Sequence, residues 1–595
     1  MGTTLASLFF ESCRRGPERP AMVYRSGHRM VTLTWEQCQR DVEAMANWFM
    51  SKGFQPGDRV ALLCETRPEW LIADLAMQAI GLVSVPIYPT LTKRQIAYIL
   101  GHAGARGLIV SHAKQLDKAM AVAGDLPDLT EVLLIEPIPV LEPTVTVTAW
   151  VDALELGTQL DKGFRAQRLV RMAAVEADSL CSIIYTSGTT GEPKGVMLSH
   201  ANFVSNVDGI HKRCAITPHD TSLSFLHLSH VLERITSYAM IAAGATIGFA
   251  GSLDTLMYDL AAIRPTVMAT VPRVLEKVHS RIREGLQHRT AVERRLWQWA
   301  LAVGHQHYVD GGGDPVSLAI ADRLVLKTIR SRFGGRLRFM VCGGAPMDRQ
   351  IGAFFQTTGI VVGEGYGLTE TSPVVSMNYP GHVKLGTVGP LLPGVRVRIA
   401  DDGEVCVKGD NVMLGYYNDE DATRDAFDAD GWFLTGDIGR MDDEGYLKIT
   451  DRKKELIVLS NGKKVAPQQI ESLLLASPFI EQVLVLGDDH PYLTALIVPD
   501  FTQVNPWAYE RGLPLDRQAL VKHVQVRQLL RDEMNRLTRD LAQFERIKQF
   551  TLLAAEWTID SGEMTPTLKG RRKVILANNT HQVTAMYQKG ETVGA

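Results

Sequence analysis

The sequence has no excess of positive charge. Its 63 lysine and arginine residues stand against 66 aspartate and glutamate residues, and the formal net charge is −3. A protein whose whole surface binds nucleic acid needs a clear basic excess. The composition therefore argues against nucleic acid as a partner and leaves room only for a local basic patch.

Cysteine is scarce and scattered. The chain has seven cysteines, and no two of them form a C-x-x-C pair. This spacing gives neither a zinc-ligand pattern nor a disulfide framework. We therefore expect the cysteines to be small buried apolar residues in a reducing compartment.

Targeting and membrane-spanning patterns are also lacking. Residues Met1–Ala6 have neither the basic start nor the long apolar core of a signal peptide, and Ala6 stands where myristoylation requires serine or threonine. Apolar stretches such as Tyr238–Gly251 are too short to cross a bilayer. The sequence predicts a cytoplasmic protein and leaves open a peripheral contact with the inner membrane face.

The chain is long, with 595 residues of which 45% are hydrophobic and 22% charged, so it can form several buried cores. Up to about residue 270, short apolar runs alternate with helix-like segments, which predicts parallel βαβ units. Capping-box pairs, Thr66 with Glu69 and Thr92 with Gln95, precede two of the predicted helices. The first predicted strands are Val60–Cys64, Val83–Ile87 and Leu108–Val110.

Beyond this alternation the pattern changes three times. Residues 276–330 are helical and charged, with a Gly-Gly-Gly interruption at 311–313. The segments Val395–Ile399 and Glu404–Lys408 alternate with a period of two, as half-exposed antiparallel strands do. After Asp451 a separate α+β portion of about one small domain follows.

The most informative segment is Tyr185–Gly195, which directly follows the apolar run Ser182–Ile184. It is rich in glycine, threonine and serine, so its backbone can turn tightly and donate hydrogen bonds to phosphate oxygens. It is not a Walker A loop, because G-x-x-x-x-G-K-[S/T] does not occur there. We favour a phosphate-binding loop over a flexible surface turn. Its predicted binding residues are Thr186, Ser187, Gly188, Thr189, Thr190, Gly191 and Lys194.

Four later segments carry side chains that suit nucleotide chemistry. In the first, Tyr366 is flanked by glycines and can stack on a base, and Glu370 offers a hard oxygen ligand for Mg²⁺. In the second, Asp437 follows a turn and can accept hydrogen bonds from ribose hydroxyls. Taken singly, each has a structural alternative, namely a turn, a cap, a solvated charge run or a basic tail. The four segments are Glu364–Thr371, Thr435–Asp437, Asp451–Leu456 and Thr565–Lys573.

The order of these segments changes their interpretation. The phosphate loop is followed by Gly-Gly-Ala-Pro at 343–346, Tyr-Gly-Leu-Thr-Glu-Thr at 366–371, Thr-Gly-Asp at 435–437, Asp-Arg-Lys-Lys-Glu at 451–455 and a late basic lysine. In this order they resemble the adenylate-forming superfamily, which contains acyl-CoA synthetases, luciferases and peptide-synthetase adenylation domains. The resemblance covers nearly the whole chain.

Four features narrow the resemblance to long-chain fatty acid–CoA ligases. They are His230–Arg234, Pro265–Arg273, the helical insertion and Thr-Pro-Thr-Leu-Lys at 565–569. The implied fold is α/β, with a large N-terminal body of two βα-layered subdomains and a small β-barrel-like subdomain, followed by a small mobile α+β C-terminal domain. We place these domains at residues 1–450 and 451–595, with the insertion at about 276–330 and the antiparallel subdomain at about 386–450.

The resemblance implies ATP-dependent ligation of a fatty acid, of long chain, to coenzyme A through an acyl adenylate, with release of pyrophosphate and AMP. Mg²⁺ is the implied cofactor. The alternatives are a fatty acyl-AMP ligase that delivers to a carrier protein, a non-catalytic acyl- or nucleotide-binding homologue, and a phosphohydrolase. The sequence also leaves open a homodimer.

The resemblance assigns a role to each matching position. Thr186 and Glu370 match the metal contacts, and Lys569 matches the catalytic lysine that reaches in from the small domain. Lys454 occupies the hinge position, and Gly462 matches the glycine beside the thiol channel. His230 matches a residue of the acid pocket, although a histidine among apolar residues is as often a satisfied core residue. The remaining implied ATP and AMP contacts are Gly344, Glu364, Gly365, Tyr366, Thr369, Asp437 and Arg452.

Overall fold

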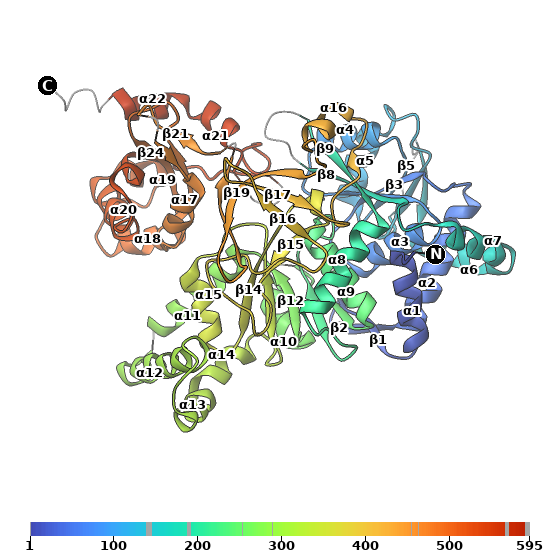
Figure 1. The fold of residues 1–595 in the computed structure, drawn as a ribbon, viewed down its shortest axis with the longest axis horizontal. Coiled ribbons are helices and arrows are strands. Elements are labelled where there is room, and N and C mark those ends of the chain that lie inside the picture. Colours follow the sequence, from blue (N-terminus) through green and yellow to red (C-terminus); the bar gives the residue numbers. More distant parts are fainter. Residues whose placement is uncertain are drawn as a thin grey trace.

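The computed structural model of the chain describes residues 2–138, 145–186, 192–252, 254–287, 289–453, 455–461, 463–565 and 570–588. Two large sheets with helices around them form the N-terminal body, and the C-terminal part, drawn in orange to red, lies at one end of the molecule (Figure 1). The C-terminal part has a hydrophobic core of its own, built from residues between Ile457 and Met586. This mixed α/β architecture agrees with the predicted fold class.

The first sheet has the strand order β18-β9-β8-β4-β3-β5-β6-β7. Strands β3 to β8 pair in parallel, as expected for βαβ units, whereas β9 turns back antiparallel to β8. The strands are β3 (Arg59–Leu63), β4 (Val83–Ile87), β5 (Ala105–Val110), β6 (Glu131–Leu134), β7 (Thr146–Ala149), β8 (Leu180–Thr186), β9 (Lys194–Ser199) and β18 (Gly415–Tyr416).

The second sheet has the order β15-β14-β13-β12-β10-β11-β1-β2. Its central strands are parallel, and its two edge strands, β2 and β15, are antiparallel to their neighbours. The strands are β1 (Pro20–Ser26), β2 (Arg29–Thr34), β10 (Thr221–Ser224), β11 (Thr246–Phe249), β12 (Val267–Thr270), β13 (Phe339–Cys342), β14 (Val361–Gly367) and β15 (Val374–Met377).

A third, antiparallel sheet has the order β16-β17-β19-β20, and smaller sheets lie in the C-terminal part. The third sheet consists of β16 (Arg396–Ile399), β17 (Glu404–Lys408), β19 (Phe433–Met441) and β20 (Leu447–Arg452). The C-terminal strands are β21 (Ile457–Val458), β22 (Lys464–Val465), β23 (Ile480–Leu486), β24 (Leu493–Pro499) and β25 (Ile547–Leu552).

Helices cover the sheets and form the insertion, which projects from the lower left of the body as α12 to α14 (Figure 1). The helices of the body are α1 (Leu5–Arg15), α2 (Trp35–Ser51), α3 (Pro68–Ala79), α4 (Lys93–Ala103), α5 (Ala113–Ala123), α6 (Trp150–Gln159), α7 (Asp161–Ala174), α8 (His200–Arg213), α9 (Val231–Ala243), α10 (Leu256–Ile263), α11 (Pro272–Gln287), α12 (Ala291–Tyr308), α13 (Pro315–Ala321), the π-helix η1 (Asp322–Leu326), α14 (Lys327–Ser331), α15 (Arg349–Thr357), the 3₁₀ turn η2 (Thr369–Thr371) and α16 (Glu420–Asp425). Those of the C-terminal part are α17 (Pro467–Leu475), α18 (Phe501–Tyr509), α19 (Arg517–Leu520), α20 (Val524–Leu537), η3 (Gln543–Glu545), α21 (Arg572–Asn578) and α22 (Thr580–Gln588).

One predicted capping box is confirmed and the other is wrong. Thr92 and Gln95 cap α4 reciprocally. Helix α3 instead begins with Pro68 at its first turn and has no side-chain cap, because a proline at this position leaves one amide fewer to satisfy. The Thr66 hydroxyl is used in a tertiary contact, in which it donates to the carbonyl oxygen of Leu226 at 2.6 Å.

The two strands predicted as half-exposed differ in burial. Strand β16 alternates between exposed and half-buried residues, as predicted. Strand β17 is buried over Glu404–Val407, because it lies between β16 and β19 in the sheet. The carboxylate of Glu404 is satisfied there by the Gly436 amide and by Lys453.

All seven cysteines are buried and unpaired, as the sequence predicts. In the described part of the chain, the helices are either too short or too polar to span a bilayer. The two tryptophans of the insertion differ, since Trp297 is buried and Trp299 is exposed.

A buried polar network joins α9 to the first sheet. Arg234 is fully buried, and its guanidinium donates to Asp74 Oδ1 at 2.5 Å and to the hydroxyls of Ser84 and Ser182 at 2.6 Å. The Tyr238 hydroxyl donates to the other oxygen of Asp74. Helix α9 also packs on strands of the second sheet. The network therefore links β8, in the first sheet, to the second sheet through α9.

Candidate nucleotide site

The predicted phosphate loop lies between two antiparallel strands. Strand β8 ends at Thr186 and β9 begins at Lys194, and these two residues are paired in the strand register. Residues 187–191, which include the predicted Ser187, Gly188, Thr189, Thr190 and Gly191, lie outside the described residues. The Lys194 ammonium sits 4.9 Å from the centre of the Tyr416 ring, so a positive charge is held beside the end of the loop.

Glu370 lies beside the same tyrosine, although it comes from the turn η2 between β14 and β15 of the second sheet. Its side chain accepts a hydrogen bond from the Tyr416 hydroxyl at 3.0 Å. Its carbonyl oxygen accepts from the Met413 amide at 2.8 Å, which ties the turn η2 to the start of β18. Burial raises the pKa of Glu370, and the Tyr416 hydrogen bond opposes this rise.

Tyr416 is the residue of this site that the sequence does not single out. It lies on β18, which pairs with β9 on the edge of the first sheet. Its ring faces Lys194 and its hydroxyl bonds Glu370. No spacing rule relates it to Glu370, because the two residues are 46 positions apart and lie in different elements.

A second group of predicted residues meets on the third sheet. Asp437 and Arg452 are register partners on β19 and β20, and Arg452 Nε lies 3.4 Å from Asp437 Oδ1. The Tyr366 hydroxyl donates to Asp437 Oδ2 at 2.7 Å. Asp437 is buried, so its charge is held by a phenol and a guanidinium in place of water.

The two groups are electrostatically connected. Tyr366 and Glu370 are four residues apart at the end of β14, and the charges of Arg452 and Asp437 both act on the pKa of Glu370. Burial raises the pKa of Tyr366, and the negative charge of Asp437 raises it further. A phenol held neutral beside an anion suits stacking and hydrogen bonding and does not suit proton abstraction.

Glu364, Gly344 and Gly367 determine the local backbone shape of the candidate site. Glu364 is buried at the end of the parallel part of β14 and accepts a hydrogen bond from the Met347 amide. Burial raises the pKa of Glu364 to about 7. Gly344 has φ +85°, which favours glycine. Gly367 lets the backbone approach closely, because a Cβ there would lie 1.7 Å from the carbonyl oxygen of Pro373.

The remaining predicted residues lie in other elements or outside the described part of the chain. Thr369 begins η2 beside Glu370, and Gly365 pairs with Met377 of β15. His230 is the N-cap of α9, where Nδ1 accepts from the Leu232 amide at 3.1 Å. Three further predictions, Lys454, Gly462 and Lys569, fall outside the described residues.

The described residues fit a magnesium ion that is shared with a nucleotide. Among them, His, Cys, Asp and Glu side chains do not gather in groups of three or more that could hold a metal. Mg²⁺ in nucleotide enzymes uses one or two carboxylates together with phosphate oxygens. The half-buried carboxylate of Glu370, near the Thr186 end of β8, could supply the protein part of such a ligand set.

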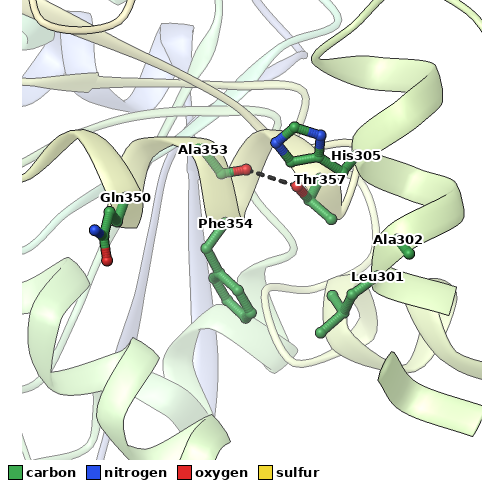
Figure 2. Close-up of a pocket in the computed structure, with 7 residues that line it drawn as sticks. All are labelled: Leu301, Ala302, His305, Gln350, Ala353, Phe354 and Thr357. Atoms are coloured by element: carbon green, nitrogen blue, oxygen red, sulfur yellow. Dashed lines mark hydrogen bonds between the residues drawn. The ribbon is translucent and has the colours of Figure 1, made fainter. Parts of the chain in front are cut away.

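A cavity of about 420 Å³ lies away from these residues, between α12 and α15 (Figure 2). Its lining has no carboxylate and no lysine or arginine, and the Thr357 hydroxyl is used within α15, where it donates to the carbonyl of Ala353. The cavity therefore lacks the groups that would bind a nucleotide. It is lined by Leu301, Ala302, His305, Gln350, Ala353, Phe354 and Thr357.

Comparison with known proteins places the chain in a family. Residues 9–417 match the family model described as AMP-binding enzyme, and residues 454–591 match the AMP-binding enzyme C-terminal domain. The chain belongs to the AMP-binding enzyme family. The resemblance predicted from the order of the motifs is thereby confirmed.

Two curated relatives of this AMP-binding enzyme match nearly throughout. It is 36% identical to the long-chain-fatty-acid–CoA ligase FadD15 of Mycobacterium bovis, over 98% of this chain and 97% of that protein. It is 33% identical to the long-chain-fatty-acid–CoA ligase 1 of Homo sapiens, over 93% of this chain and 82% of that protein.

Solved structures share the fold of this AMP-binding enzyme. The adenylation domain of a carboxylate reductase from Mycobacterium chelonae matches with a TM-score of 0.78 at 23% identity, over 99% of this chain and 91% of that chain. The anthranilate CoA ligase AuaEII, solved with anthranoyl-AMP, matches with a TM-score of 0.73 at 19% identity, over 98% of both chains. At these identities the likeness shows the fold alone.

Proposed function

We propose that this AMP-binding enzyme ligates a long-chain fatty acid to coenzyme A, using ATP and passing through an acyl adenylate. The observation that carries the proposal is the meeting of Glu370, Tyr416 and Lys194 beside the Asp437–Arg452 pair. The full-length similarity to curated long-chain fatty acid–CoA ligases supports the choice of substrate.

In the first half-reaction the obstacle is charge, because an anionic carboxylate must approach the α-phosphorus of ATP. Catalysis then depends on positioning and on electrostatic stabilisation. Lys194 and the loop 187–191 would hold the β- and γ-phosphates. Thr186 and Glu370 would bind Mg²⁺, which neutralises phosphate charge when it is present.

The nucleoside is held by the second group of residues. Asp437 would accept hydrogen bonds from the ribose hydroxyls, with Arg452 beside it. Tyr366 would lie against the adenine, bordered by Gly344, Glu364 and Gly365, and Thr369 would reach the α-phosphate. The hydrogen bond from Tyr366 to Asp437 supports this arrangement, because it fixes the base and ribose residues relative to one another before the nucleotide binds.

In the second half-reaction the coenzyme A thiol attacks the acyl carbonyl, and AMP leaves. We assign Lys569 to the preceding half-reaction, the formation of the acyl adenylate, as its catalytic lysine. Lys454 would act as the hinge of a C-terminal domain that moves between the steps, and Gly462 would border the thiol channel. The separate hydrophobic core of the C-terminal part supports motion as a unit, with a domain boundary near residue 450.

The acyl pocket is proposed near His230. Its place at the N-terminus of α9 supports a position beside the second sheet, since Leu232 packs against Gly343, which precedes the candidate nucleotide residue Gly344. The Nδ1 atom of His230 is engaged in capping, so the imidazole would contribute shape to the pocket and not act as a base.

The helical insertion supports a peripheral contact with a membrane. It exposes apolar side chains, with Val292 78% and Val316 66% accessible. Residues 276–330 carry nine lysine and arginine residues against six aspartate and glutamate residues. Exposed apolar groups among cations suit an anionic lipid surface. Val316→Ser should reduce co-sedimentation with phosphatidylglycerol vesicles, and unchanged binding would contradict the contact.

A homodimer would be tested by light scattering, which measures the molar mass of the protein in solution.

The function is tested with a panel of carboxylic acids of increasing length, by following AMP formation with and without coenzyme A. We expect long-chain acids to give AMP and pyrophosphate, with turnover that requires coenzyme A. Turnover that depends on a carrier protein would favour the fatty acyl-AMP ligase. Release of phosphate in place of pyrophosphate would indicate a phosphohydrolase, and no acid-dependent reaction would refute the proposal.

A further inference from the structure

A second cavity of about 420 Å³ lies at the β19–β20 hairpin, which also carries Asp437 and Arg452 of the candidate nucleotide site. It is formed where the start of α15, the loop after β15 and the β19–β20 hairpin meet. Its volume is in the range of small-ligand pockets. None of the residues proposed to bind ATP lines it. Its lining consists of Arg349, Lys384, Leu385, Gly386, Thr387, Arg440, Met441, Asp442, Asp443 and Lys448.

Two cations face each other across the hairpin at this cavity. Arg440 on β19 and Lys448 on β20 are direct register partners. Residues opposite one another on antiparallel strands extend to the same face, and like charges in this arrangement are destabilising. Such a pair is retained at a cost in stability, which an anion bound between the two side chains would remove.

Of the two acidic side chains that line the cavity, Asp442 is paired with a lysine and Asp443 is exposed to solvent. Lys384 pairs with both Asp442 and Glu444 at 2.7 Å, and Asp442 Oδ1 also accepts from the Tyr446 amide. In the described part of the chain, Arg349, Arg440 and Lys448 have no carboxylate oxygen within 4.0 Å. Four cationic side chains and two carboxylates line the cavity, and three of the cations, from three segments, have no paired carboxylate in the described part of the chain.

The cavity wall is tied to the candidate nucleotide site. The buried Asn378 side chain donates to the carbonyls of Glu364 and Thr387 and accepts from the Lys384 amide. The β19–β20 hairpin carries the cation pair at one end and Asp437 with Arg452 at the other. A ligand in the cavity would thus hold the same hairpin that positions the proposed ribose contacts.

We propose that this cavity binds a phosphate-bearing anion at a site separate from the one proposed for ATP. Two guanidinium groups and one ammonium group match the several oxygens of a phosphate, which arginine can bind with two parallel hydrogen bonds. The anion has two candidate sources. One is the adenosine 3′,5′-bisphosphate end of coenzyme A, and the other is free inorganic phosphate or pyrophosphate.

The test is isothermal titration calorimetry on the full chain with AMP present at saturation, so that the proposed nucleotide cleft is not counted. The probes are adenosine 3′,5′-bisphosphate and, separately, inorganic pyrophosphate. The variants are Arg440→Gln and Lys448→Gln, and the matched control is Arg396→Gln, an exposed arginine of the same sheet. We expect at least ~10-fold weaker binding in each cavity variant, as for the loss of one charge-assisted contact, and unchanged binding in the control.

The two sources are separated by the KM for coenzyme A. A raised KM in the cavity variants, together with binding of the bisphosphate, identifies the end of coenzyme A as the ligand. Binding of pyrophosphate with an unchanged KM identifies a free phosphate anion. The melting temperature without ligand should be unchanged or higher in Lys448→Gln, because a like-charge pair is removed. Equal binding in wild type and both cavity variants, or binding of neither probe, overturns the proposal.

Discussion

The hydrogen bond between Tyr416 and Glu370 leads to a prediction about the acid limb of the pH profile. The Tyr416 hydroxyl donates to Glu370 Oε1 at 3.0 Å, and this bond opposes the rise in pKa that burial imposes on Glu370. A hydrogen bond to a charged group contributes about 1.5–3 kcal/mol, and one pKa unit corresponds to about 1.4 kcal/mol. Tyr416→Phe should therefore raise the pKa of Glu370 by about 1–2 units.

The size of the expected shift depends on the magnesium concentration. Only the ionised carboxylate of Glu370 could bind the proposed magnesium ion, so activity should fall as the pH drops through the pKa of this group. In Tyr416→Phe the fall should begin at a higher pH. Because metal and proton compete for the same oxygen, the shift should be largest at low magnesium and should shrink as magnesium approaches saturation.

The assay is acid-dependent ATP–pyrophosphate exchange, measured against pH at two magnesium concentrations. The matched control is Tyr417→Phe, since Tyr417 is the next residue but contacts His102 through its ring and Gly195 through its backbone. An acid limb that stays in place in Tyr416→Phe, or that moves equally in Tyr417→Phe, would refute the reasoning.

Three further outcomes are expected. Asp74→Ala should lower the free energy of unfolding by about 3–5 kcal/mol, because it leaves Arg234 buried without its counter-charge; urea unfolding measures this, and a loss below about 1 kcal/mol would contradict it. Lys569→Ala should slow ATP–pyrophosphate exchange at least ~100-fold, as for one preorganised charge donor, whereas the exposed Lys573→Ala should not. Lys454→Pro should spare this exchange and depress thioester formation, and equal loss of both activities would count against a hinge.

The sequence predicts those parts of the fold that depend only on neighbouring residues. The strand at 83–87 and the capping box of Thr92 and Gln95 need only neighbouring residues, and both occur as predicted. The Thr66 capping box does not, because Pro68 starts the helix and the Thr66 hydroxyl bonds the carbonyl of Leu226, 160 residues away. The burial of β17 depends on its neighbours in the sheet, which its own alternation cannot reveal.

In the candidate site, too, some contacts follow from the local sequence and others depend on distant elements. Asp437 and Arg452 lie at matched positions of one hairpin, so their pairing follows from the register of β19 and β20. Tyr416 is different, because it meets Glu370 only when β18 joins the edge of the first sheet. A contact of this kind depends on the assembly of separate elements, and the sequence contains no local signal for it.

The site is built where the three sheets meet. Some of its residues therefore also hold sheets together, and variants of these residues should differ from variants of residues that only bind the nucleotide. The Tyr366–Asp437 bond joins β14 to β19, so the same contact shapes the site and holds two sheets together. Tyr366→Phe leaves a buried carboxylate with one partner fewer, and it should lose stability and ATP affinity together. Lys194 contacts the Tyr416 ring through its ammonium, a contact that contributes only about 0.5–1 kcal/mol at an accessible position. Lys194→Gln should therefore lose ATP affinity with little change in melting temperature, and a matching loss of stability would show that Lys194 is structural.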